Sequence, residues 1–235
     1  MEFGKKIIGS PWKFIQDVFF PPVCINCQNP IADQKLFLCQ SCFEEINLNS
    51  SLYCPECMAR IPGNIRCHNA GYVLAPASRF EAPIPALIYA FKYGKIERLN
   101  VLLSALVISY LIRTKIEVSE YVITFVPLHG SKQRARGFNQ AQLLASTVSG
   151  YFSCTPVNIL RRIKNNPPQA KIKSYTQRAA NISECFRITL PQTIAGKNVI
   201  VIDDVSTSGA TLNEISSLLK KYGAKKIIGL VVAKA

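Results

Sequence analysis

The feature that most constrains this chain is an apolar run that leads directly into two carboxylates, a few small hydroxyl residues and a glycine. It spans residues 199–211 and reads VIVIDDVSTSGAT. Four consecutive β-branched residues predict a strand that is buried on both faces, as in a parallel sheet. The small residues predict a short loop that leads into a helix. Because ligands bind beyond the carboxyl ends of strands in open parallel sheets, we expect a binding site here.

The loop after this strand is suited to a phosphate group. Backbone N–H groups and hydroxyls can surround a phosphate, Gly209 allows close approach, and the helix N-terminus adds its positive end. The adjacent carboxylates can accept hydrogen bonds from the two hydroxyls of a ribose, so the pattern indicates ribose 5-phosphate. An ordinary strand end and turn is the alternative interpretation. The predicted binding residues are Asp203, Asp204, Val205, Ser206, Thr207, Ser208, Gly209, Ala210 and Thr211, with Asp203 and Asp204 as the catalytic candidates.

The cysteines form a second pattern. Seven of the nine lie between Cys24 and Cys67, and six of them form C-x-x-C pairs. This spacing is typical of zinc sites in a reducing compartment. The predicted Zn²⁺ ligands are Cys24, Cys27, Cys39 and Cys42, and a second candidate set is Cys54, Cys57, Cys67 and His68. Equal eleven-residue gaps leave a crossed pairing open, in which the first and third C-x-x-C pairs share a metal.

The chain divides into three parts by composition. We expect an N-terminal helix in residues 1–23, a cysteine-rich zinc-binding module in 24–71 and an α/β domain in 72–235. The predicted strands are 72–77, 121–126, 199–202 and 226–232, and the predicted helices are 85–93, 98–113, 139–151 and 211–222. This alternation predicts a mainly parallel, doubly wound sheet. The most apolar stretch, 101–112, is too short for a membrane span, so we expect a cytoplasmic protein without one.

Positive charge is unevenly distributed. The net charge is +14, and residues 76–235 hold 22 Lys and Arg against eight Asp and Glu. No acidic residue lies between Glu120 and Glu184, which enclose nine basic residues. The pattern predicts a polyanionic ligand, either a polyphosphate or a nucleic acid, although a solubilising face is the simpler alternative. Residues 161–178 could form a lid over a polyphosphate or an ordinary basic loop.

The segment 199–211 resembles the 5-phosphoribosyl-1-pyrophosphate (PRPP) motif of type I phosphoribosyltransferases. Three further stretches resemble the ComF family: FKYG at 91–94, VPLH at 126–129 with RGFNQ at 136–140, and residues 169–186. The resemblance implies that fold, PRPP with Mg²⁺ as ligand, and a role in DNA uptake during natural transformation. It adds Lys92, Arg136, Asn139 and Arg178 to the predicted site. Because the strand 121–126 should end at the ligand-binding edge of the sheet, we expect the turn 127–131 to be the pyrophosphate loop.

Three functions are compatible with these patterns. The protein could be an active phosphoribosyltransferase with a small-molecule acceptor, or a PRPP-binding protein that handles single-stranded DNA, alone or with a helicase-type competence protein. It could also be a zinc-anchored adaptor. Residues 72–120 would have to form the hood over the acceptor. Stacking of single-stranded DNA would fall to Phe138, Tyr151, Phe152 and Tyr175.

Overall fold

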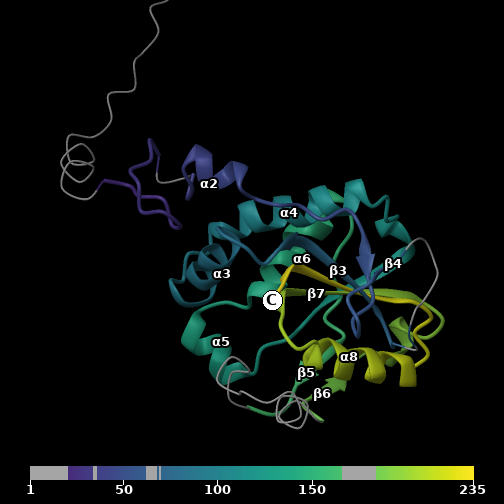
Figure 1. Cartoon of the computed structure of the whole chain (residues 1–235). Helices are drawn as coiled ribbons and strands as arrows, with labels where there is room; N and C mark the ends of the chain where they lie inside the picture. Colours follow the sequence, from purple (N-terminus) through teal and green to yellow (C-terminus); the bar gives the residue numbers. More distant parts are fainter. Residues whose placement is uncertain (1–20, 34–35, 62–67, 69, 166–183) are drawn as a thin grey trace, which may run out of the picture.

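The computed structural model describes residues 21–33, 36–61, 68, 70–165 and 184–235. The helix expected within residues 1–23 lies almost entirely outside these residues, as does most of the lid expected at 161–178. Figure 1 shows the described part, with a central sheet enclosed by helices and a small lobe around α2 (Gln40–Glu44) at one side. No helix in the described ranges is long and apolar enough to cross a membrane.

The sheet has six strands in the order β2-β1-β3-β8-β7-β4. Its centre is parallel, as predicted, and consists of β3 (Val73–Arg79), β8 (Ile227–Lys234), β7 (Asn198–Ser206) and β4 (Tyr121–Phe125). The register pairs Val122 with Val199 and Val199 with Ile227. Two short antiparallel strands, β1 (Leu52–Tyr53) and β2 (Arg60–Ile61), extend one edge.

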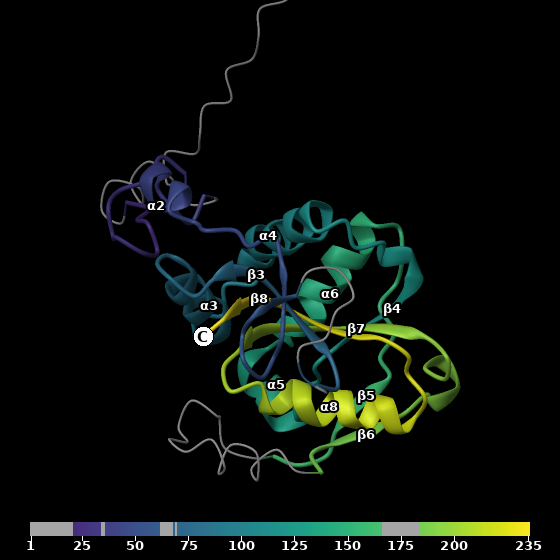
Figure 2. The same ribbon diagram turned by 45° about the vertical axis from the view of Figure 1, so that its right-hand side comes forward.

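Helices cover both faces of the sheet. Figures 1 and 2 show α4 (Leu99–Arg113) and α6 (Gln140–Tyr151) on one face and α8 (Ala210–Lys221) on the other. Burial on both faces explains why the central strands are almost wholly apolar rather than alternating. A separate hairpin of β5 (Leu160–Arg162) and β6 (Phe186–Ile188) packs beside α8, while α3 (Ile84–Tyr93) packs beside α4. The remaining elements are α5 (Gly130–Arg136) and the 3₁₀ turns η1 (Val118–Glu120) and η3 (Pro191–Thr193).

The cysteine-rich region is joined directly to the sheet. Tyr53 pairs with Leu74 of β3, and Leu48 forms a bridge with Ser78. The buried Tyr110 of α4 donates a hydrogen bond of 2.7 Å to the Ser51 carbonyl. The sheet therefore continues across residue 72, where the sequence predicts that the α/β domain begins.

Two elements differ from the sequence prediction in ways that matter for the site. The strand predicted at 199–202 continues as β7 to Ser206, because β8 pairs with it as far as Lys234. Asp203 and Asp204, expected at the C-terminal end of this strand, lie within it, and the strand continues two residues beyond them. The predicted turn at 127–131 is shorter than expected, because α5 begins at Gly130 and His129 caps it by accepting a hydrogen bond from the Ser131 amide.

Candidate functional site

The loop between β7 and α8 contains only Thr207, Ser208 and Gly209. Gly209 has φ +76°, which favours glycine, and a Cβ at this position would lie only 3.2 Å from Tyr72 Oη. The Ser206 hydroxyl is buried and has no hydrogen-bond partner among the described residues. This buried hydroxyl and the N-terminus of α8 border a small recess of about 20 Å³. The recess therefore offers hydrogen-bond donors and a positive helix end to an anion.

A larger cavity of about 330 Å³ lies in front of the two carboxylates, between α3, α5, the start of α6 and β7. It brings together residues that are distant in sequence. The predicted residues lining it are Lys92, Arg136, Asn139, Asp203, Asp204, Val205, Thr207 and Thr211. Ser206, Gly209 and Ala210 line the smaller recess instead, and Ser208 lines neither space but accepts a hydrogen bond from the Ala210 amide. Arg178 lies outside the described residues.

Lys92 forms an ion pair with Asp204. The Lys92 Nζ to Asp204 Oδ1 distance is 2.8 Å, and the two side chains are 17% and 7% exposed. From the sequence alone, neither aspartate has a neighbouring cation, so only the packing of α3 against the end of β7 provides this partner. The two aspartates are thus unequal, because Asp204 is buried against Lys92 whereas Asp203 is partly exposed at the cavity.

Burial and, to a smaller extent, the neighbouring Asp204 carboxylate raise the pKa of Asp203 from 3.8 to about 7, against the opposing effect of Lys92. The Asp203 carboxyl accepts a 2.9 Å hydrogen bond from the Asp204 amide. Between pH 4 and 7 the unfolded chain ionises this carboxyl while the folded chain keeps it protonated. Folding stability contributed by Asp203 is therefore lost as pH rises through this window.

We expect Asp203→Asn to remove this loss of stability without changing the shape of the side chain. The variant should be more stable than the parent by about 1 kcal/mol or more at pH 8, or roughly 2–4 °C in Tm for a chain of this size. The difference should shrink as the pH falls toward the unfolded-state pKa of 3.8. Thermal unfolding followed by circular dichroism across pH 4.5–8 measures the difference, and equal Tm differences at both ends would contradict an ionisation effect.

The RGFNQ motif forms the junction between α5 and α6. Gly137 ends α5 with φ +92°, and Phe138 is buried against Phe91 with ring centroids 5.4 Å apart. Asn139 caps α6 by accepting from the Ala141 amide at 3.1 Å, and it donates to the Val126 carbonyl at 3.1 Å. Both ends of its side-chain amide are therefore engaged in holding the backbone that surrounds the cavity.

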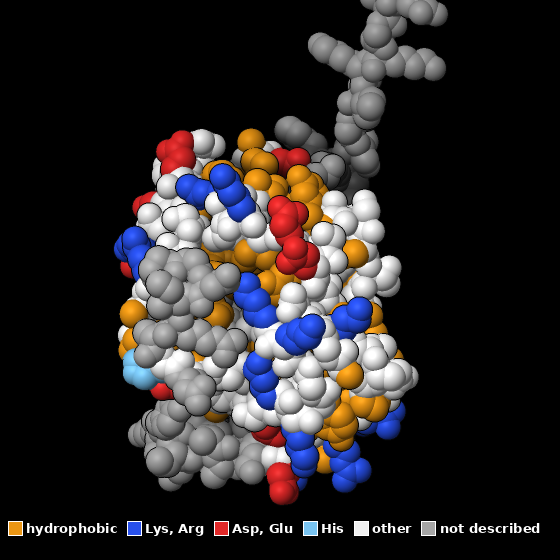
Figure 3. Space-filling model, turned by 90° about the vertical axis from the view of Figure 1, so that its right-hand side faces the viewer, with side chains coloured by type: hydrophobic (Ala, Val, Ile, Leu, Met, Phe, Trp, Pro, Cys, Tyr) orange, Lys and Arg blue, Asp and Glu red, His pale blue; other side chains and the backbone are white. Residues whose placement is uncertain are grey.

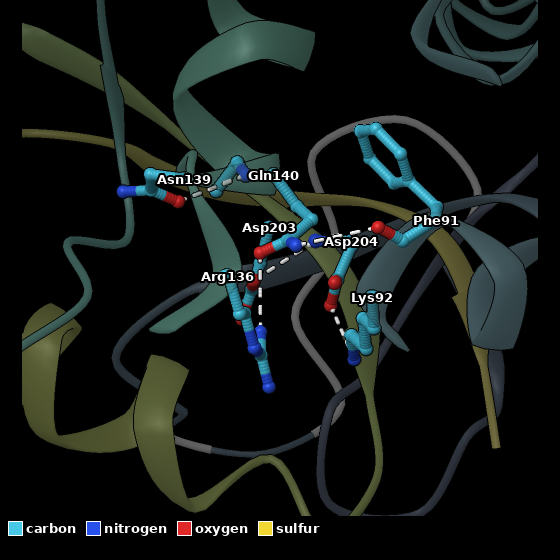
Figure 4. A network of polar contacts seen from close by, with 8 residues as sticks. Phe91, Lys92, Arg136, Asn139, Gln140, Asp203 and Asp204 are labelled. Carbon is cyan, nitrogen blue, oxygen red and sulfur yellow. Dashed lines mark hydrogen bonds and ion pairs between the residues drawn. The ribbon is translucent and has the colours of Figure 1, made fainter. Parts of the chain in front are cut away.

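Gln140 connects Arg136 to the residue before Lys92. Its Nε2 donates to the Phe91 carbonyl at 3.4 Å, and its Oε1 accepts from Arg136 Nη1 at 3.1 Å. Figure 4 shows that these contacts and the Lys92–Asp204 pair form one network from α3 to α5, α6 and β7. We did not predict Gln140 as a site residue, although its position in the RGFNQ motif marked it.

Three cations gather at the cavity besides Lys92. Lys132, Arg136 and Arg162 line it, and the pKa of Lys132 is lowered by burial and by repulsion from Arg162 and Arg136. Among the described residues, neither Arg136 nor Arg162 forms an ion pair with a carboxylate. A cluster of cations at one cavity favours a bound polyanion. Lys132 and Arg162 were recognised in sequence only as part of the basic region.

Arg162 is held in place from α8. The β5–β6 register pairs it with Phe186, and its guanidinium lies 5.4 Å from the centre of the Phe186 ring. Glu214 of α8 accepts hydrogen bonds from the Cys185 and Phe186 amides at 2.6 and 3.3 Å, and its burial raises the pKa of its carboxyl. Helix α8, which follows the loop between β7 and α8, thus also orients the β5–β6 hairpin that carries Arg162.

The aromatic residues expected from sequence near the basic segment do not line this cavity. Phe138 is buried, Tyr151 and Phe152 pair with each other at the far end of α6, and Tyr175 lies outside the described residues. Instead, Phe80, Tyr89 and Tyr93 line the cavity. The sequence could have indicated the two tyrosines, because they are four residues apart on the helix that carries Lys92 and so lie on one face of it.

The zinc ligands predicted first are assembled as expected. The Sγ atoms of Cys24, Cys27, Cys39 and Cys42 all lie within 4.8 Å of one another, and those of Cys27 and Cys39 are 3.5 Å apart. Tetrahedral zinc with bonds of about 2.3 Å places sulfur atoms about 3.8 Å apart, so the four thiols fit this ion. Asn26 Nδ2 donates to Cys42 Sγ at 3.3 Å. This arrangement excludes the crossed pairing.

A second group contains Cys54, Cys57 and His68, whose ligand atoms also lie within 4.8 Å of one another. Cys54 Sγ and His68 Nδ1 are 3.4 Å apart. Cys67, the fourth predicted ligand, lies outside the described residues. Thiolate and imidazole are the donors that zinc prefers, so this group offers three suitable ligands.

Comparison with known proteins agrees with both halves of this architecture. The phosphoribosyl transferase domain family matches residues 135–235, and the double zinc ribbon domain family matches residues 15–71. The chain is 30% identical to Competence protein F of Haemophilus influenzae over 89% of this chain and 95% of the relative. The chain belongs to the ComF family. This membership confirms the resemblance noted in the sequence and the type I phosphoribosyltransferase fold.

Other ComF family relatives agree with this assignment. The DNA utilization protein YhgH of Escherichia coli is 26% identical over 88% of this chain and 94% of its own length. Competence protein ComFC of Bacillus subtilis is 35% identical, over 44% of this chain and 40% of its own length. The residues that match the double zinc ribbon family include both cysteine groups. Together with the geometry of these groups, this match supports structural zinc.

Proposed function

We propose that this protein binds PRPP in the 330 Å³ cavity and acts in DNA uptake as a ComF-type protein. The observation that carries the proposal is the meeting of three complementary groups in one place. A loop rich in hydroxyls and amides at the start of α8 suits the 5-phosphate, the carboxylates of Asp203 and Asp204 suit the ribose hydroxyls, and a cationic cluster suits the pyrophosphate. No single one of these groups would distinguish PRPP from a simpler phosphate.

Each residue of the proposed site has a distinct role. Ser206, Thr207 and Thr211 bind the 5-phosphate, while Asp203 accepts hydrogen bonds from the ribose. Lys92 fixes the Asp204 carboxylate, and Asn139 positions the backbone. Lys132, Arg136 and Arg162 face the negative charge that grows on the departing pyrophosphate. Bound Mg²⁺ would share that charge, and Asp203 is the partly exposed oxygen donor suited to hold it.

Isothermal titration of the full-length protein with PRPP, with and without Mg²⁺, tests this assignment. We expect saturable binding of one PRPP per chain that is strengthened by Mg²⁺. Ribose 5-phosphate should bind more weakly, because it lacks the pyrophosphate that the cations contact. Absence of PRPP binding in folded, zinc-containing protein would overturn the proposal.

The proposed role in DNA uptake rests on the relatives' names and on a second basic surface. A neighbouring polar cavity of about 710 Å³ is lined by Arg134, Arg161 and Arg162, and no carboxylate is among the described residues that line it. It shares Leu128, Asn139 and Arg162 with the first cavity. A single-stranded DNA backbone could therefore lie across this second cavity and reach the first. DNA and PRPP would then compete for Arg162.

We expect the change of Arg134 and Arg161 to alanine to weaken binding of single-stranded DNA while PRPP affinity is retained, because neither residue lines the first cavity. In fluorescence anisotropy with a labelled oligonucleotide, the slope of log affinity against log salt should become shallower by about 0.7 for each lost phosphate contact. Excess PRPP should also weaken DNA binding by the parent.

The control must separate this surface from general positive charge. Figure 3 shows Lys and Arg side chains spread over another face of the molecule. Lys197 and Lys225 precede β7 and β8, at the opposite ends of these strands from Asp203, and both are exposed. Alanine at these two positions should change the salt slope little. Equal effects of both pairs would assign DNA binding to net charge rather than to this cavity.

An adaptor role is the second candidate, and one surface favours it. An apolar groove between the cysteine-rich lobe and α4 is lined by Leu36, Phe43 and Val101, which are 57%, 50% and 70% exposed. Exposed apolar surface of this kind suits a protein partner such as a helicase-type competence protein. None of the described cysteines forms a disulfide, which fits a reducing compartment, so we propose the cytoplasm.

A further inference from the structure

Two tyrosines of α3 lie at the mouth of the proposed PRPP cavity with their rings largely in solvent. Tyr89 and Tyr93 are 67% and 51% exposed, and their ring centroids are 5.0 Å apart with an interplanar angle of 46°. Both line the cavity, as does Phe80, which is 37% exposed. Large aromatic side chains bury 150–250 Å² each when covered, so three exposed rings around one opening provide substantial binding surface.

The tyrosine pair is connected to the polar network of the cavity. The Arg136 guanidinium lies 5.4 Å from the centre of the Tyr93 ring, while its Nη1 donates to Gln140 at 3.1 Å. Lys92, on the same turn of α3, reaches inward to Asp204 at 2.8 Å. A single helix face therefore presents two rings at the opening and a cation inside it. Because Arg136 is anchored by Gln140, Tyr93 is supported on one side rather than isolated.

We propose that Tyr89 and Tyr93 form a stacking platform for a nucleobase, either of a free nucleotide or of a single-stranded DNA. This proposal rests on the proposed function and adds the class of the second ligand. Charge complementarity decides the occupant. A purely apolar ligand would suit the rings but not the cations beside them, which are Lys92, Lys132, Arg136 and Arg162. A simple phosphate would bind the cations but leave the rings uncovered. A ligand with a planar heterocycle next to a phosphate satisfies both surfaces.

The tyrosine platform can be removed with little risk to the fold. Both residues are exposed on a helix, and leucine is a better helix former than tyrosine, so Tyr89→Leu with Tyr93→Leu should keep the structure. The double change to phenylalanine keeps the ring faces. Tyr151→Leu is a matched control, because Tyr151 is 60% exposed at the C-terminal end of α6 and does not line the cavity.

Two ligand pairs separate the sources of the base. The first compares AMP with ribose 5-phosphate by calorimetry, and the second compares a labelled oligothymidylate with an abasic oligonucleotide of equal length by anisotropy. In at least one pair, the parent should bind the base-bearing ligand about 5- to 100-fold more tightly. The leucine variant should lose this preference, while the phenylalanine variant and Tyr151→Leu should keep it. A preference in the first pair identifies a free nucleotide, and one in the second identifies DNA.

The proposal is overturned if the parent shows no preference for bases in either pair, or if the leucine variant retains the preference in full. The leucine variant should still bind PRPP with saturation, weakened at most by loss of the contact between Tyr93 and the Arg136 guanidinium. If the parent fails to bind PRPP but loses base preference on leucine substitution, the proposed function fails while the platform stands. The two failures are thus distinguishable.

Discussion

Replacement of Asp203 and Asp204 together by alanine should abolish detectable PRPP binding. Hydrogen bonds to a charged group contribute about 1.5–3 kcal/mol each, so loss of two such acceptors predicts a decrease of about 100-fold or more. The same calorimetric titration with Mg²⁺ measures it. Asp203→Ala alone should cost about tenfold, because Asp203 is the partly exposed carboxylate at the cavity whereas Asp204 is already held by Lys92.

Controls for this experiment follow from the ion pair. Asp204→Ala leaves the Lys92 ammonium without its 2.8 Å partner in a mostly buried position, which destabilises the site by itself. Adding Lys92→Met restores charge balance and separates loss of folding from loss of binding. Glu117→Ala with Glu120→Ala removes two carboxylates beside η1, before β4, and should leave PRPP affinity unchanged. Parent-like PRPP binding by the aspartate double variant would mean that these carboxylates do not contact the ribose.

Zinc removal should have the largest effect on stability. Structural zinc contributes about 10 kcal/mol or more in small zinc-binding modules, and Leu38 is the only buried apolar side chain besides Cys24 and Cys42 among the described residues between 21 and 46. We expect purified protein to contain at least about one zinc per chain. Chelation or Cys39→Ser with Cys42→Ser should release it and expose this segment to proteolysis.

The sheet should remain folded in the zinc-free protein, because its core consists of β3, β4, β7 and β8 with the helices that cover them. Elemental analysis, limited proteolysis and circular dichroism together measure these effects. Cys154→Ser is the control, because Cys154 belongs to neither described metal-binding group. Folded, protease-resistant protein with less than about half an equivalent of zinc would contradict a structural metal.

Local chemistry explains which parts of the site could be predicted from the sequence. Four β-branched residues before Asp203 require a buried strand, and a glycine with positive φ between β7 and α8 produces a tight loop. The two C-x-x-C pairs form a metal cluster because each pair lies on a tight turn or short helix that sets its own spacing. These features depend on residues a few positions apart, so sequence spacing determines them.

Only the tertiary structure decided which distant residues meet at the cavity. Lys92 reaches Asp204 because α3 packs beside the end of β7, and Gln140 joins Arg136 to the Phe91 carbonyl because α6 begins at the same place. β7 extends beyond Asp203 and Asp204 to Ser206 because β8 continues to pair with it as far as Lys234. Tyr89 and Tyr93, rather than the aromatic residues of the basic segment, line the opening because α3, which carries them, lies beside the cavity. Contacts between segments separated by tens of residues depend on packing and strand pairing, whereas spacing along the chain specifies only the loop, the carboxylates and the cysteine pairs.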